Sequence, residues 1–218
     1  MNFDTVIDRK GTYCTQWDYV KDRFGKDGLL PFTISDMDFQ APKEIIEALI
    51  KRVNHGVFGY SRWNHEDFKN SIEFWYKSRF NYQIDKEWIL YAPSVIYSVA
   101  KFIEMKLGKG DGVLIFTPAY DGFFKVIGDN DRKIISSPLI KNGNNYEVDF
   151  EDFEKKCKEA KIFLMCSPHN PVGKVWSREE LEKIISICKK YNIFIISDEI
   201  HMDIVYKGKH TPILEVAG

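Results

Sequence analysis

Residues 161–200, KIFLMCSPHNPVGKVWSREELEKIISICKKYNIFIISDEI, decide the fold. Two short apolar runs, at 161–167 and 192–197, are typical of buried strands. Residues 177–191 between them have the spacing of an amphipathic helix, and Ser177 with Glu180 matches a capping box at its start. A strand, a helix and a strand in this order predict two parallel strands joined by a crossover helix.

The same alternation continues toward the N-terminus. Strands are expected at 88–92, 112–117 and 133–140, and helices at 94–107, 119–128 and 149–160. We therefore predict an α/β protein with a mostly parallel sheet covered by helices on both faces. Two more helices are expected earlier, one at 42–56 that ends at Gly56 and one at Glu66–Phe80. The first forty residues have little periodicity and are expected to form an irregular arm.

Composition excludes several classes of protein. The 218 residues include 31 basic and 32 acidic side chains, so no single-sign field favours nucleic acid or an acidic membrane. The N-terminus lacks the apolar region of a signal peptide, and no apolar run approaches the ~20 residues that cross a bilayer. The four cysteines match no zinc motif and are expected to be free thiols. We expect a cytoplasmic protein without a metal site.

Polar groups follow the carboxyl ends of the predicted strands, where ligands bind in such sheets. Ser94 opens a helix whose N-terminus can bind an anion, Tyr120 follows the strand at 112–117, Asn170 follows the strand at 161–167, and Asp198 follows the strand at 192–197. Each of them also has a simpler explanation. Ser94 would cap an ordinary helix, Tyr120 would pack against its neighbours, Asn170 would lie in a turn, and Asp198 would form a salt bridge. Together they fit a flat, cationic heteroaromatic ring with a phosphate tail, which is pyridoxal phosphate. Asp198 would pair with its protonated ring nitrogen.

Several motifs also resemble a known family. SPHNPVGKVW (167–176) and ISDEIHMD (196–203) resemble fold-type-I pyridoxal-phosphate enzymes of the class I/II aminotransferase superfamily, which have the aspartate-aminotransferase-like fold. FTISDMDFQAP (32–42), FGYSRW (58–63), APSVIYSV (92–99) and TPAYDGFF (117–124) are similar to its MalY/PatB branch of cystathionine β-lyases. The resemblance extends from about Asp8 to the last residue.

The resemblance implies a role for each matching residue. The backbone amides of Val95 and Ile96 would hold the phosphate, Tyr120 would stack on the ring, Asn170 would bond its phenolic oxygen, and Asp198 would pair with its nitrogen.

Three further features of the resemblance concern the substrate and the partner subunit. Tyr60 would reach the phosphate of the neighbouring subunit in a homodimer, and the segment Asp36–Phe39 would lie near the substrate. His201 stands where aminotransferases commonly have tyrosine, which favours a lyase. A histidine that only packs beside the cofactor is the alternative.

The resemblance also implies how the chain is divided. Residues 1–45 would form an N-terminal arm and part of a small domain, and 46–218 an incomplete cofactor-binding large domain. The Schiff-base lysine is expected beyond Gly218, and Lys207 and Lys209 lie too close to Asp198 to match it. We therefore expect a chain truncated before its catalytic lysine, with no catalytic residue of its own and low stability alone.

Three functions remain in competition. The full-length protein is expected to be a pyridoxal-phosphate-dependent carbon–sulfur β-lyase, converting cystathionine or a cysteine-like amino acid to thiol, pyruvate and ammonia. An aminotransferase of the same fold is the first alternative. A non-catalytic, truncated cofactor-binding or regulatory protein is the second. A dinucleotide-binding domain would need G-x-G-x-x-G after its first strand, and the sequence has none.

Overall fold

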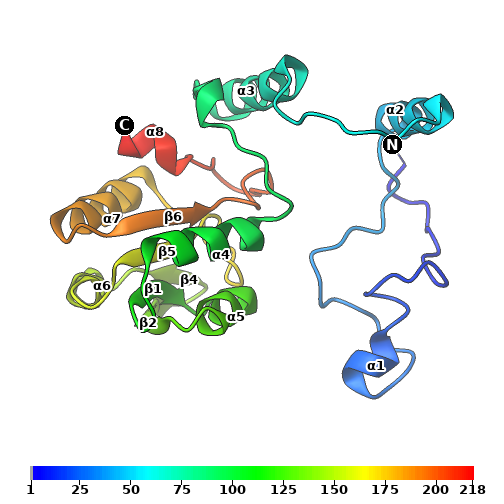
Figure 1. The fold of residues 1–218 in the computed structure, drawn as a ribbon. Coiled ribbons are helices and arrows are strands. Elements are labelled where there is room, and N and C mark those ends of the chain that lie inside the picture. The colour runs from blue at the N-terminus through cyan, green and yellow to red at the C-terminus, as the bar shows by residue number, and fades with distance from the viewer. Residues whose placement is uncertain (1) are drawn as a thin grey trace. The chain divides into compact units, whose positions relative to one another are not determined.

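A computed structural model describes residues 2–218 (Figure 1). The chain divides into two compact units, Met1–Ser61 and Arg62–Gly218, which we describe separately. The resemblance implies a different boundary, between residues 45 and 46, which divides the chain by the function of its parts. This boundary stays a prediction.

The first unit contains the helices α1 (Val20–Phe24) and α2 (Lys43–His55). Helix α2 confirms the helix expected at 42–56. It ends at Gly56, whose φ of +73° lies in the left-handed region that glycine adopts without strain. The apolar stripe of α2 forms as expected, but Ile45, Leu49 and Val53 on it are exposed.

The second unit begins with α3 (Glu66–Phe80), which confirms the predicted helix. A short 3-10 helix, Lys86–Trp88, follows. The strand predicted at 88–92 is wrong. Ile89 has an extended backbone and is buried, but no neighbouring strand pairs with this segment in the part of the chain that the structure describes. An apolar run becomes a strand only where a second strand offers it hydrogen bonds.

The central sheet of the second unit contains β1 (Gly112–Thr117), β2 (Lys133–Pro138), β5 (Ile162–Cys166) and β6 (Phe194–Asp198). Their order is β2-β1-β5-β6, and every pair is parallel. All five residues of β5 are buried, because this strand has neighbours on both sides and helices on both faces. That environment explains the continuous apolar run in its sequence.

Successive residues of the inner strands point to opposite faces of the sheet. Val113 and Ile115 of β1 pack in one buried cluster with α4 (Val95–Lys106) and α5 (Asp121–Asp129). Leu114 and Phe116 pack in the other cluster with α6 (Phe150–Cys157) and α7 (Arg178–Lys190). Helices on both faces confirm the predicted α/β class. Ser177 and Glu180 form the predicted capping box of α7.

The sequence analysis missed a hairpin. Strands β3 (Ile140–Asn142) and β4 (Asn145–Glu147) pair antiparallel after β2. Gly143 occupies their turn with a φ of +59°. The dipeptide Gly143-Asn144, which forms the two-residue turn, is the signal that could have found it. A last helix, α8 (Ile213–Ala217), lies near the C-terminal end of the described chain.

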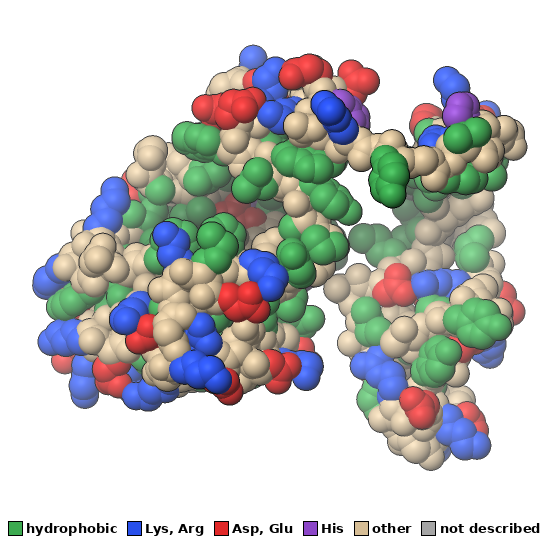
Figure 2. All heavy atoms as spheres, in the orientation of Figure 1, with side chains coloured by type: hydrophobic (Ala, Val, Ile, Leu, Met, Phe, Trp, Pro, Cys, Tyr) green, Lys and Arg blue, Asp and Glu red, His purple; other side chains and the backbone are tan. Residues whose placement is uncertain are grey.

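The surface carries charged side chains of both signs as well as exposed hydrophobic ones (Figure 2). Figure 2 shows Lys and Arg side chains interspersed with Asp and Glu on the visible face. Residues 2–218 contain no helix with the length and apolar character needed to traverse a bilayer. Within the same residues, no three His, Cys, Asp or Glu side chains gather as metal ligands would. The four cysteines are buried and free, as expected.

Candidate functional site

The carboxyl ends of the central strands meet at one edge of the sheet, which we call the carboxyl edge. Strand β1 ends there at Thr117, β5 at Cys166 and β6 at Asp198. Pairing continues one residue beyond β5, because the amide of Ser167 donates a hydrogen bond to the carbonyl oxygen of Asp198 at 2.8 Å. In open parallel sheets this edge is where ligands bind.

Asp198 is a buried carboxylate at the carboxyl edge. The residue is only 6% exposed, and its Oδ1 accepts a hydrogen bond from the amide of Ile200 at 3.1 Å. It forms no ion pair with any lysine or arginine of residues 2–218. Burial raises the pKa of Asp198, and the Ile200 amide and the His201 imidazole only oppose that effect. A ligand group that brings a positive charge or a donor would therefore be favoured beside it.

The N-terminus of α4 offers two unused backbone donors. Ser94 caps this helix, and its Oγ accepts a hydrogen bond from the third amide, that of Tyr97, at 3.2 Å. The amides of Val95 and Ile96, the first two of the helix, have no acceptor among the residues that the structure describes. Residues 107–111 connect the end of α4 to the start of β1, so the helix runs back along the sheet and begins near the carboxyl edge. Two free amides at a helix N-terminus bind anions.

Tyr120 lies at the start of α5, directly after the loop that leaves β1. Its ring is 38% exposed and meets the ring of Phe123 edge-to-face at 5.8 Å. The outer part of the ring is therefore available to a ligand, while its edge is fixed by the helix.

Asn170 lies in the loop that leaves β5. Two backbone hydrogen bonds close this loop, from the amide of His169 to the carbonyl of Lys174 at 2.7 Å and from the amide of Gly173 to the carbonyl of His169 at 2.8 Å. The side chain of Asn170 is half-buried, and within residues 2–218 its amide group makes no hydrogen bond. Its donor and its acceptor are thus both available at the carboxyl edge.

The two remaining predicted residues, His201 and Tyr60, lie in different parts of the structure. His201 is half-buried in the turn after β6, three residues beyond Asp198. Tyr60 is fully exposed and belongs to the first unit. Val95, Ile96, Tyr120, Asn170, Asp198 and His201 all belong to the second unit.

Glu199 organises the segment after β6, and the sequence analysis missed it. Its Oε2 lies 2.8 Å from Nε2 of His210, and its Oε1 accepts hydrogen bonds from Ser197 Oγ and from the amide of Ile213, both at 2.9 Å. The His210 side chain is fully buried. The sequence signal that could have identified Glu199 is its position directly after Asp198. Successive side chains at a strand end point to opposite sides, so the second carboxylate must have partners of its own.

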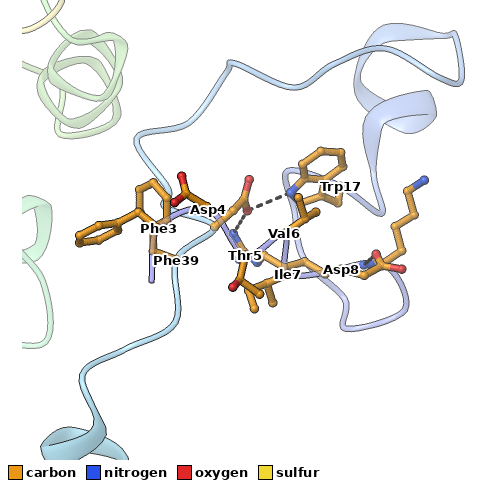
Figure 3. A pocket seen from close by; sticks show the side chains of 11 residues that line it. Phe3, Asp4, Thr5, Val6, Ile7, Asp8, Trp17 and Phe39 are labelled. Carbon is orange, nitrogen blue, oxygen red and sulfur yellow. Dashed lines mark hydrogen bonds and ion pairs between the residues drawn. The ribbon is translucent and has the colours of Figure 1, made fainter. Parts of the chain in front are cut away.

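A separate pocket of about 500 Å³ lies in the first unit (Figure 3). Phe3 and Phe39 meet edge-to-face at 5.1 Å beside it. Asp38 accepts hydrogen bonds from Arg9 at 2.8 Å and from Trp17 Nε1 at 3.0 Å, which hold the pKa of its carboxyl below the usual range. These contacts fix part of the segment Asp36–Phe39, but the lining includes none of the predicted cofactor residues.

The chemical groups at the carboxyl edge indicate which kind of ligand would fit there. The free amides of Val95 and Ile96 suit an anion, Tyr120 suits a flat ring, Asn170 can donate to a ring oxygen, and Asp198 suits a protonated ring nitrogen. A phosphorylated, cationic heteroaromatic cofactor is compatible with all of these groups.

A parallel sheet with helices on both faces defines an α/β protein, and the ligands of such proteins bind at the carboxyl edge of the sheet. The chain belongs to the aminotransferase class I and II family, whose family model matches residues 27–218.

Two curated relatives indicate the branch of the family that this chain resembles. Protein MalY of Escherichia coli (strain K12) is 48% identical over 219 residues, covering 99% of this chain and 56% of MalY. Cystathionine beta-lyase PatB of Bacillus subtilis (strain 168) is 37% identical, covering 97% of this chain and 55% of PatB. The resemblance to the MalY/PatB branch is thereby confirmed. The chain spans about half the length of these relatives.

Two solved structures have the same fold. Cystalysin from Treponema denticola, which contains a pyridoxal 5'-phosphate cofactor, matches with a TM-score of 0.93 and 36% identity. The pyridoxal-phosphate-bound C–S lyase from Staphylococcus hominis matches with a TM-score of 0.93 and 30% identity. Each match covers 99% of this chain and 56% of the other. They confirm the predicted fold-type-I architecture.

Proposed function

We propose that this chain is the cofactor-binding part of a pyridoxal-phosphate-dependent carbon–sulfur β-lyase. The buried carboxylate of Asp198 carries the proposal, because it lacks a cationic partner among the described residues and ends a strand at the ligand-binding edge. The named relatives and solved structures support the same class, since they include a cystathionine beta-lyase and a C–S lyase.

The residues at the carboxyl edge divide the binding of the cofactor among them. Pyridoxal phosphate, when bound, supplies a pyridinium ring that stabilises negative charge on the substrate carbon. Asp198 would keep the proton on the ring nitrogen, because its buried negative charge favours a neighbouring positive one. The amides of Val95 and Ile96 would hold the phosphate, Tyr120 would cover one ring face, and Asn170 would donate to the ring oxygen.

The remaining parts of the proposal concern the whole protein. Its substrate would be a sulfur-containing amino acid such as cystathionine or a cysteine-like compound, and its products thiol, pyruvate and ammonia. It would act as a cytoplasmic homodimer in which Tyr60 reaches the phosphate site of the neighbouring subunit. His201 would lie beside the ring and favour elimination over amino transfer. Residues 1–45 would serve as an arm and part of a small domain, and 46–218 as part of the large domain.

The test uses the full-length gene product, purified with pyridoxal phosphate and supplied with cystathionine. We expect equal amounts of pyruvate and free thiol, and their loss in Asp198→Asn. Asp129→Asn, which removes an exposed carboxylate on α5, should retain both. A protein that transfers the amino group to a 2-oxo acid without forming pyruvate would be an aminotransferase instead. A protein that binds the cofactor but forms neither product would be non-catalytic.

A further inference from the structure

His169 is a buried imidazole that the proposed function leaves without a role. It is 2% exposed, and its ring packs edge-to-face against Phe116 at 6.5 Å and Trp176 at 5.6 Å. It directly precedes Asn170 in the loop after β5. A titratable ring enclosed in this way is oriented by its neighbours and can hold other groups in place.

The ring of His169 joins two loops that are distant in the sequence. Its Nε2 lies 2.8 Å from the carbonyl oxygen of Pro118, 51 residues away along the chain. Pro118 lies in the loop after β1 and is two residues before Tyr120. The contact therefore connects the loop that carries Asn170 with the loop that carries Tyr120.

The partners of the ring decide its protonation. A carbonyl oxygen only accepts hydrogen bonds, so Nε2 must carry the proton. Nδ1 is buried and makes no hydrogen bond among the described residues. A proton on Nδ1 would therefore be an unpaired, buried charge. Burial lowers the pKa of His169 by more than the Pro118 and Cys166 backbone raises it, which agrees with a neutral ring.

We propose that His169 is a positioning residue, which holds Pro118 through a neutral Nε2–H donor and thereby fixes Tyr120 and Asn170 relative to each other. The proposal rests on the proposed function, because Tyr120 and Asn170 are cofactor contacts only there. Two backbone hydrogen bonds, of His169 with Lys174 and of Gly173 with His169, hold the other side of the loop. The imidazole is the side-chain link from this loop to the loop after β1.

The first test is independent of the cofactor. Nitrogen-15 NMR of the full-length protein, prepared without cofactor and labelled at histidine, should show one neutral ring with the proton on Nε2 at pH 7. The signal is assigned by its absence from His169→Gln. A proton on Nδ1, or a fully charged ring, would overturn the proposal.

The second test measures the dissociation constant of pyridoxal phosphate by absorbance titration. His169→Leu removes the donor and should weaken binding about tenfold, whereas His169→Gln can still donate to Pro118 and should stay within about threefold of wild type. Ile184→Val, in the core cluster with α7, is a matched control that lowers stability without touching the carboxyl edge.

The outcomes separate the two proposals. Wild-type protein that binds no pyridoxal phosphate would contradict the proposed function, while the NMR result still decides the hydrogen bond. Wild-type protein that binds the cofactor, with His169→Leu binding equally well, would contradict the positioning role alone.

Discussion

The ring of Tyr120 lies against the backbone of Gly122. A Cβ atom at position 122 would come within 2.8 Å of Tyr120 Cζ and closer still to Cε1. Real Cβ atoms do not approach other atoms so closely, so the aromatic ring keeps its place because residue 122 has no side chain. This glycine is required for space rather than for a special backbone angle.

Gly122→Ala should therefore displace the Tyr120 ring and weaken pyridoxal phosphate binding about as much as Tyr120→Ala does. We expect about a tenfold loss, because a base-like ring stacked on an aromatic side chain gains on the order of 1 to 3 kcal/mol. An absorbance titration of the full-length protein checks this. Gly128→Ala in the same helix meets no atom within 4 Å and should leave binding unchanged while stabilising α5 by up to about 1 kcal/mol. Equal binding in both variants would contradict stacking by Tyr120.

Val95→Pro removes one of the two free amides at the start of α4. Proline is tolerated at the first position of a helix, and Ser94 already has the extended backbone that a following proline requires. We expect folding to be retained and the dissociation constant of pyridoxal phosphate to rise severalfold, with a smaller effect on pyridoxal, which has no phosphate. Val95→Ala is the control, since it shortens the same side chain but keeps the amide. An equal effect on both ligands would exclude a phosphate contact at this amide.

Asp198→Asn should stabilise the cofactor-free protein while it weakens cofactor binding. The folded-state pKa of Asp198 is raised by burial, so its unfavourable charge is fully present above that pKa and disappears below the unfolded value of about 3.9. Asparagine keeps the oxygen that accepts from Ile200 but carries no charge. We expect the free energy of unfolding to rise by about 1 kcal/mol at pH 7 and by much less near pH 4. Urea unfolding at both pH values measures this, and a destabilised variant at pH 7 would show that Asp198 has a cationic partner.

His210→Leu should destabilise the second unit. The substitution leaves Glu199 Oε2 without the hydrogen bond that joins it to His210, and an unsatisfied acceptor on this partly buried carboxylate costs about 1 kcal/mol. Urea unfolding should therefore show a lower midpoint with an unchanged slope. His55→Leu, on the exposed end of α2, is the control and should change stability by less than about 0.5 kcal/mol. An unchanged midpoint for His210→Leu would mean that Glu199 is satisfied by its other partners.

The sequence predicted the strands of the sheet best where both faces of a strand are buried. The inner strands β1 and β5 are enclosed on both faces, and their continuous apolar runs are typical of the strands of a parallel sheet. The run at 88–92 has a similar composition, but whether it pairs depends on what lies beside it in space. Local composition cannot show that, and the prediction was wrong. The β3–β4 hairpin was missed although Gly143-Asn144 marks its turn.

The candidate site also has a part that the sequence predicts and a part that only the structure shows. Asp198, Asn170 and Tyr120 could be proposed from sequence because each follows a strand, and strand ends are predictable. Their roles stay predictions, as do those of Val95, Ile96, His201 and Tyr60. The contact between His169 and Pro118 and the ion-pair geometry of Glu199 with His210 join residues that only the folded chain brings together. No spacing rule identifies such contacts.

The strand order β2-β1-β5-β6 also fixes an order of assembly. Within the described chain β6 pairs only with β5, and β5 joins the older part of the sheet only through β1. A chain that emerges from the ribosome N-terminus first presents β1 and β5 before β6, and we expect β6 to dock on the strands that have already paired. Of these four strands, β6 is the last along the chain, so the Asp198 carboxylate reaches its place only after β5 has joined the sheet. Cofactor uptake during refolding should accordingly follow the pairing of β5 with β1.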